Sequence, residues 1–275
     1  MQSLHALSYS TTLPLPHLAG RTAWSILSHH HHACNLLTDD GTLVALVSEV
    51  HGNGPFHIVV PGARFDTITT VSPVVWHASL LHIGPYTIAL REARPWHPRV
   101  AKITIFEPTD FLLAHLSSLQ SASPLYTGLP ALVERAQHGM DQLQSGLIPH
   151  NEQFIDEGTK QLAGLGPGLT PAGDDFLVGL LAALTVWPAR WSATAAIRQQ
   201  IATCAQSRTT RLSGAWLTHA GVGHFGEGWH QLVAAFNGGV ATSIIDSVTA
   251  MAMTGATSGI DALCGFHFGL QLVAR

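Results

Sequence analysis

The stretch that decides the fold is GLGPGLTPAGDDFLVG, residues 164–179, where glycines and a Thr-Pro step lead into two aspartates and an apolar run. Thr170 is a good N-cap residue, and Pro171 suits the first helical position because its missing N–H costs nothing there. The stretch therefore predicts an apolar, buried helix over residues 171–186, opened by an acidic first turn.

The start of this helix also has features of a binding site. Gly166 and Gly168 permit positive φ angles and a close approach of the backbone to a ligand. The free N–H groups of a first helical turn favour an anion. Asp174 and Asp175 would orient an amide or ligate Mg²⁺, although the sequence requires no particular cofactor. A capped helix whose acids only satisfy the helix dipole is the alternative, and the residues leave both interpretations open.

A second segment repeats the pattern. Residues 173–179 and 259–265 share the form G-x-D-x-L-x-G, and each copy follows a hydroxyl residue and opens an apolar helix. In the second copy Thr257 or Ser258 would be the N-cap, and Asp261 would be a capping carboxylate. Any two amphipathic helix starts are partly alike by chance. That these two helix starts lie together around one site is therefore a hypothesis.

Residues 208–226, RTTRLSGAWLTHAGVGHFG, place two arginines and three hydroxyl residues at a predicted helix start. Guanidinium groups and hydroxyls suit phosphate or carboxylate, and a polar cap with a solvated arginine pair is the alternative. His219 and His224 are candidate general acids or bases, but lone histidines are more often structural.

The composition limits the partners. Hydrophobic residues make up 46% of the chain and charged residues 11%, against about 25% charged residues in ordinary soluble domains. We therefore expect extensive burial, in the core or against partner subunits, including a homo-oligomer. The net charge of −4 and the absence of a basic stripe argue against nucleic acid.

The cysteines and apolar runs point to the cytoplasm. Cys34, Cys204 and Cys264 form no C-x-x-C pair, and their odd number favours a reducing compartment. The N-terminus lacks the pattern of a signal peptide. The apolar run 176–187 is too short to span a bilayer, so we expect no membrane association.

The two parts of the chain differ in pattern. Residues 32–50 hold two apolar runs separated by Asp39-Asp40-Gly41, a hairpin signal, and the glycine-rich segment 51–66 is a candidate loop over the helical site. From Thr109 the apolar residues take helical spacing. We predict an α+β chain with an antiparallel β-rich domain, a small sheet or barrel, over residues 1–107. An all-helical domain over 108–275 follows, with later helices at 191–207, 209–221, 226–237, 239–253 and 258–273.

The histidine run His29–His32 is not expected to be a physiological metal site. Contiguous side chains in a regular strand point to alternate faces, so they cannot all approach one ion.

Several segments together resemble one family. LGPGLTPAGDDFLVGLL (165–181), TTRLSGAWLTHAGVGHF (209–225) and TSGIDALCGFHFGLQL (257–272) occur in this order in AllH-like (YlbF-like) proteins, long catalogued as a domain of unknown function. So do NLLTDDGTLVAL, GNGP and ARFD in the N-terminal part. The resemblance covers approximately residues 35–275.

This resemblance implies a subunit of the anaerobic oxamate carbamoyltransferase, acting with FdrA-like and AllG-like subunits in allantoin or purine breakdown. That system moves a carbamoyl group from carbamoyl-oxamate to phosphate, giving oxamate and carbamoyl phosphate. Family membership does not say which subunit performs the chemistry. A non-catalytic assembly or small-anion-binding subunit therefore stays open, as does a stand-alone metal-dependent hydrolase.

Carbamoyl transfer to phosphate develops negative charge on a tetrahedral oxyanion, which helix N–H groups, Thr170 and Arg211 would stabilise. The candidate catalytic residues are Thr170, Asp174, Asp175 and Arg211. The candidate residues for substrate or anion binding are Gly166, Gly168, Arg208, Thr209, Thr210, Ser213, Thr257, Ser258, Asp261, Asn53 and Arg64.

Overall fold

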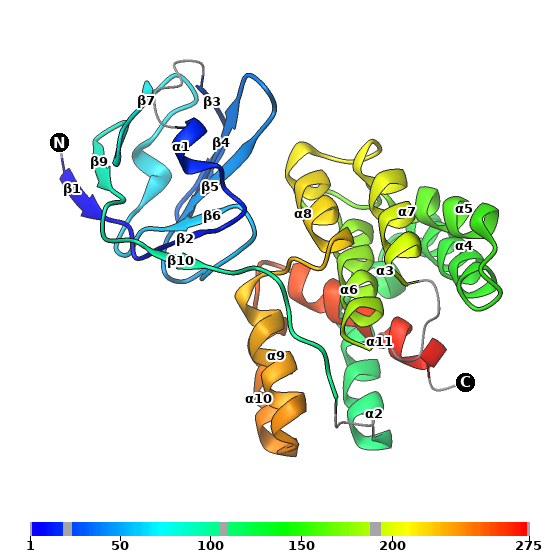
Figure 1. The fold of residues 1–275 in the computed structure, drawn as a ribbon. Helices are drawn as coiled ribbons and strands as arrows, with labels where there is room; N and C mark the ends of the chain where they lie inside the picture. The colour runs from blue at the N-terminus through cyan, green and yellow to red at the C-terminus, as the bar shows by residue number, and fades with distance from the viewer. Residues whose placement is uncertain (1, 19–23, 105–108, 188–193, 274–275) are drawn as a thin grey trace. The chain divides into compact units, whose positions relative to one another are not determined.

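The computed structural model describes residues 2–18, 24–104, 109–187 and 194–273 (Figure 1). Contacts within the chain divide it into two compact units, residues 1–98 and 99–275. The first unit carries strands and the second helices, which confirms the predicted α+β class. The predicted boundary between residues 107 and 108 lies outside the described residues.

The strands of the N-terminal unit divide between two sheets. One has the order β10-β2-β6-β5-β4-β3 and the other the order β1-β9-β8-β7. Most neighbouring strands are antiparallel, but β1 pairs with β9, β5 with β6, and β2 with β10 in parallel. The strands are β1 (Gln2–His5), β2 (Ser8–Ser10), β3 (Trp24–His30), β4 (Ala33–Thr38), β5 (Leu43–Val47), β6 (His57–Val59), β7 (Val74–His77), β8 (Leu80–Ile83), β9 (Tyr86–Ala89) and β10 (Arg94–Trp96).

The predicted hairpin at Asp39–Gly41 is confirmed. It joins β4 to β5, and Gly41 takes a φ of 84°, which glycine adopts without strain. All five residues of β5 are buried, as is typical of a central strand that is covered on both faces. Two short helices complete the unit, α1 (Leu15–Leu18) and the 3-10 turn η1 (Phe65–Thr67).

The C-terminal unit is helical in all its named elements, and the helices lie within a few residues of the predicted ranges. Residues 191–193 of the predicted helix 191–207 lie outside the described part. The helices are α2 (Asp110–Ser118), η2 (Leu119–Ala122), α3 (Pro124–Thr127), α4 (Pro130–Leu147), α5 (Glu152–Leu162), α6 (Ala172–Val186), α7 (Thr194–Gln206), α8 (Arg211–Gly221), α9 (Glu227–Gly238), α10 (Ala241–Ala252) and α11 (Ser258–Val273). No helix among the described residues is long and apolar enough to cross a membrane.

Helix α6 forms the core of this unit. It lies among the other helices of the unit (Figure 1) and packs against α5, α7, α8 and α11. Each of its residues except Asp175 is buried. This burial explains why its sequence is apolar on all sides, as the stretch 164–179 predicted. The N-terminal turn of α6 is therefore fixed in position by helices that come from both earlier and later parts of the chain.

The repeated G-x-D-x-L-x-G pattern corresponds to a reciprocal contact between α6 and α11. A Cβ atom on Gly179 would lie 1.7 Å from the carbonyl oxygen of Ala262, and one on Gly265 would lie 1.8 Å from that of Phe176. The last glycine of each copy (Gly179 or Gly265) thus lies against the fourth residue of the other copy (Ala262 or Phe176). The two helices are thus related by a local two-fold arrangement, in backbone contact at their glycines.

Candidate functional site at two paired helix starts

The N-terminal ends of α6 and α11 lie together. Thr170 Oγ1, just before α6, is 3.1 Å from Oγ of Ser258, the first residue of α11. Thr170 is not the N-cap that the sequence predicted: Pro171 holds that position, without a side-chain cap, and the Thr170 hydroxyl contacts Ser258. The pairing of the two helix starts, which the sequence left open, is therefore present in the structure.

The two adjacent aspartates have different surroundings. Asp174 is buried and accepts hydrogen bonds from the Gly164 N–H (2.9 Å) and from the Thr209 hydroxyl. Burial raises the pKa of Asp174, and those hydrogen bonds, with the Ser213 hydroxyl, oppose the shift. The Asp174 carboxylate thus ties the glycine loop to the segment before α8.

Asp175 points to a different environment. Its Oδ2 is buried and has no hydrogen-bond partner among the described residues. Burial raises the pKa of Asp175 well above its ordinary value, the nearby carboxylates of Asp261 and Asp174 raise it further, and the Ser258 hydroxyl lowers it. Such a carboxyl group retains its proton to higher pH and can then donate a hydrogen bond.

Asp261 occupies the position in α11 that Asp175 occupies in α6. Its Oδ1 accepts a hydrogen bond from Ser123 Oγ (2.5 Å), and its Oδ2 is buried without a partner among the described residues. Burial raises the pKa of Asp261 to about 6, against the effect of the Ser123 and Thr257 hydroxyls. The site therefore contains two carboxyl groups, each with one buried oxygen that has no hydrogen-bond partner among the described residues.

The glycine loop before α6 is held in a shape that requires glycine. Gly164, Gly166 and Gly168 have φ angles of 69°, 117° and 95°, which other residues rarely adopt. A Cβ on Gly164 would also lie 2.6 Å from the carbonyl oxygen of Arg208. Gly168 faces open space, so it is the loop glycine with room for a ligand beside it.

The start of α8 supports this loop. Thr210 caps α8 by accepting from the Ser213 N–H (3.1 Å), and its hydroxyl donates to the Leu169 carbonyl (2.5 Å). The Ser213 hydroxyl donates to the same carbonyl at 3.4 Å. The hydroxyls of Thr210 and Ser213 thus donate to the loop, and that of Thr209 donates to Asp174. Their predicted contact with an anion stays a prediction. Arg208 and Arg211 have exposed side chains next to this region.

Ser123 is a residue of the site that the sequence analysis missed. It caps α3 by accepting from the Leu125 N–H (3.2 Å), and its hydroxyl donates to Asp261. The Ser-Pro pair at 123–124 signals a helix start. No local pattern indicates a partner that lies 138 residues further along the chain.

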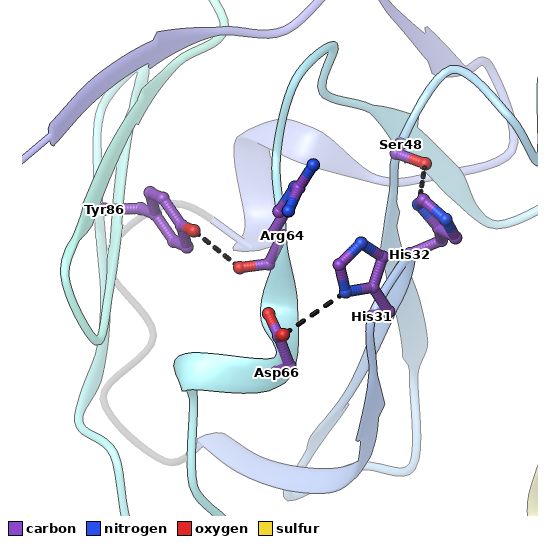
Figure 2. Close-up of polar contacts among 6 residues, drawn as sticks. All are labelled: His31, His32, Ser48, Arg64, Asp66 and Tyr86. Carbon is purple, nitrogen blue, oxygen red and sulfur yellow. Dashed lines mark hydrogen bonds and ion pairs between the residues drawn. The ribbon is translucent and has the colours of Figure 1, made fainter.

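Asn53 and Arg64 belong to the N-terminal unit. Asn53 Oδ1 accepts a hydrogen bond from the Ser8 hydroxyl (2.6 Å). The Arg64 carbonyl accepts one from the Tyr86 hydroxyl (2.5 Å; Figure 2), and the Arg64 side chain is exposed. Their role at the helical site stays a prediction.

The histidine run forms the end of β3 (His29 and His30) and the turn to β4 (His31 and His32). His31 Nδ1 is 3.2 Å from Asp66 Oδ2, and His32 Nδ1 is 3.1 Å from Ser48 Oγ (Figure 2). His31 lowers the pKa of the Asp66 carboxyl group through this contact. In the part of the chain that the structure describes, no three His, Cys, Asp or Glu side chains are grouped to hold a metal ion. Mg²⁺ at Asp174 and Asp175 stays a prediction.

His219 and His224 lie together at the far end of α8, with ring centroids 5.9 Å apart. Burial, and then the neighbouring His224, lowers the pKa of His219 to about 4. Burial, and then Arg99, lowers the pKa of His224. Both rings are therefore neutral near pH 7, and neither carries the extra proton that a histidine general acid donates.

Two family models together match most of the chain. Residues 162–270, which include α6, α8 and most of α11, match the family described as oxamate carbamoyltransferase subunit AllH. Residues 5–95 match the AllH family N-terminal domain. The chain belongs to the AllH family, as its sequence motifs indicated. No solved structure matches the chain.

Proposed function

We propose that this chain is the subunit of an oxamate carbamoyltransferase-like complex that binds the carbamoylated substrate at the paired starts of α6 and α11. The reaction is that of carbamoyl-oxamate with phosphate to give oxamate and carbamoyl phosphate, in anaerobic allantoin or purine catabolism. The family match supports the reaction class. The observation that carries the location is the buried Oδ2 of Asp175, which has no hydrogen-bond partner within the described ranges and belongs to the carboxyl group beside Ser258, the residue that Thr170 contacts.

The chemistry suits these groups. A phosphate oxygen attacks the carbamoyl carbon, and an oxyanion forms that the Thr170 and Ser258 hydroxyls and the Arg211 guanidinium would stabilise. The C–N bond to oxamate then breaks, and the leaving nitrogen takes a proton from Asp175. The proton of hydrogen phosphate restores the Asp175 carboxyl group. The net reaction moves one proton from hydrogen phosphate to the oxamate nitrogen.

The partners follow from the same proposal. The family is described as a subunit, and we expect the chain to act in the cytoplasm with FdrA-like and AllG-like subunits. Co-expression with these partners and size-exclusion chromatography test the assembly, and release of carbamoyl phosphate tests the activity. If the complex forms but the isolated chain and the complex both fail to bind oxamate or carbamoyl-oxamate, the proposed substrate site is wrong.

A non-catalytic assembly subunit is the second candidate. It is favoured by large apolar side chains that the helical unit leaves exposed, namely Phe111 (68% exposed), Leu129 (76%) and Met253 (80%). Covering such side chains with a partner would remove apolar surface from water, which favours association. An isolated chain that is monomeric and catalyses the transfer without partners would exclude this second function.

The stand-alone metal-dependent hydrolase is the least supported of the three hypotheses. Both oxygens of Asp174 already accept hydrogen bonds, one from Gly164 and one from Thr209. A metal at the adjacent aspartates would have to replace those bonds.

A further inference from the structure

Basic side chains gather at the C-terminal end of α6, opposite the paired helix starts. Lys102 Nζ donates to the Thr185 carbonyl (2.6 Å), and Arg198 Nη1 donates to the Leu184 carbonyl (3.5 Å). Arg198 Nε also donates to the Gly221 carbonyl at the end of α8 (3.4 Å). These two cations therefore bind carbonyl groups in the last turns of two helices, which is a favourable place for positive charge.

Arg99 joins this group but has no such structural role. The Arg99 backbone pairs with that of His224, and the Val100 N–H donates to the Gly223 carbonyl (3.1 Å). The Arg99 guanidinium lies beside Gly223, with Nη1 4.0 Å from the position of a Cβ atom there. It makes no hydrogen bond or ion pair with any residue that the structure describes. His224 Nδ1 is buried and likewise has no partner within the described ranges.

Positive charge at the C-terminal end of α6 is not balanced by negative charge from the described residues. Arg99, Lys102 and Arg198 are three of the chain's 13 cationic residues, and no described carboxylate pairs with them. Burial, followed by repulsion from the other two cations, lowers the pKa of Lys102. Burial and then Arg99 lower the pKa of Arg198. Like charges held together repel each other, and an anion between them would offset that repulsion.

The geometry points to a second anion site at this basic cluster, defined by Arg99, Lys102, Arg198 and His224. The site takes a small oxyanion that ends in a phosphate or a carboxylate. Arg99 supplies a planar fork of N–H donors that bonds to no residue the structure describes, and His224 supplies Nδ1–H as a further donor. Lys102 and Arg198, fixed on helix carbonyls, contribute charge.

This basic cluster is separate from the proposed substrate site. Helix α6 has 15 residues, so its two ends lie about 22 Å apart. The inference does not rest on the proposed function, because it uses none of the residues at the paired helix starts.

The test measures binding of inorganic phosphate, sulfate and oxamate to the full chain by isothermal titration calorimetry. Arg99→Gln should weaken phosphate binding at least about tenfold, the loss expected for one charge-assisted hydrogen bond. Arg91→Gln, a charge-matched change at an exposed arginine of the N-terminal unit, should leave it unchanged. Tighter binding of phosphate and sulfate than of oxamate identifies a phosphate-type site, and the reverse order a carboxylate site.

Two outcomes would overturn the inference. One is equal phosphate affinity of Arg99→Gln and Arg91→Gln. The other is loss of binding in Arg211→Gln but not in Arg99→Gln, which would place the anion at the paired helix starts and leave the proposed function intact.

A second measurement covers the case in which Arg99→Gln fails to fold. Phosphate should raise the pKa of His224 in the wild-type chain, followed by NMR of the ring and assigned through His224→Gln. An anion beside the ring favours its charged form. An unchanged His224 titration in saturating phosphate would refute the site.

Discussion

Asp175→Asn separates the catalytic interpretation of the paired helix starts from a structural one. Asparagine has nearly the same shape as aspartate, so the packing between α6 and α11 should survive. The amide cannot give a proton to the oxamate nitrogen. Loss of a general acid costs roughly 10²–10⁴-fold in rate. In a complex with its partner subunits, kcat for carbamoyl phosphate formation should therefore fall by about that factor.

The thermal stability of the same variant should increase at alkaline pH, although its turnover falls. The pKa of Asp175 is raised in the folded chain by burial, so the folded state binds this proton more tightly than the unfolded state. The free energy of unfolding therefore decreases as pH rises above the ordinary aspartate pKa, and this loss is complete above the folded pKa. Asp175→Asn removes the loss, so the variant should melt at a higher temperature than wild type at pH 8 and at a similar temperature near pH 4.

The assay combines turnover of the reconstituted complex with thermal unfolding of the isolated chain at both pH values. Asp156→Asn is a matched control, because Asp156 lies on α5 and accepts from Gln200 (2.9 Å), away from the helix starts. Wild-type turnover in Asp175→Asn would refute the proposed site. Lower turnover together with a lower melting temperature at pH 8 would instead show that Asp175 supports the fold.

Three further changes test the structure around the site. In the wild type, the free energy of unfolding should fall by about 3 kcal/mol between about pH 3 and pH 7, because burial raises the pKa of Asp261 from 3.8 to about 6. Asp261→Asn should abolish this loss, and equal pH dependence in variant and wild type would contradict it. Gly265→Ala, whose Cβ would lie 1.8 Å from a carbonyl oxygen of the facing helix, should lower the free energy of unfolding by about 3 kcal/mol. Gly238→Ala, with nothing within 4 Å of its Cβ, should not lower it, and similar denaturation curves for the two would count against the helix contact. Thr209→Val should lower the free energy of unfolding by about 1–3 kcal/mol, because it removes the hydroxyl that donates to the buried Asp174 carboxylate. An unchanged midpoint in chemical denaturation would mean that this hydrogen bond does not stabilise the fold.

The helices could be predicted from the sequence because their signals are local. The Thr210 cap and the start of α11 at Ser258 follow from residue types within one turn. The division of strands between two sheets could not be predicted in this way. β1 pairs with β9, more than 80 residues later in the chain, and no local periodicity specifies such a partner.

The candidate site could be predicted only in part. The repeated pattern indicated that α6 and α11 begin alike, but the Thr170–Ser258 contact depends on how the two helices pack. Asp174 and Asp175 are neighbours in sequence, and successive side chains on a helix point about 100° apart. Asp174 therefore faces the glycine loop and Thr209, whereas Asp175 faces α11. Two adjacent aspartates in a sequence do not indicate this difference in environment.

The glycine contacts between α6 and α11 have a consequence for the energetics of ligand binding. Because each helix contacts the backbone of the other at Gly179 and Gly265, neither can slide or rotate without a clash or a gap. The hydroxyls and carboxyl groups at their starts are thus preorganised before any ligand arrives. Less conformational entropy is then lost on binding, so a small ligand with few contacts can still be held in one orientation.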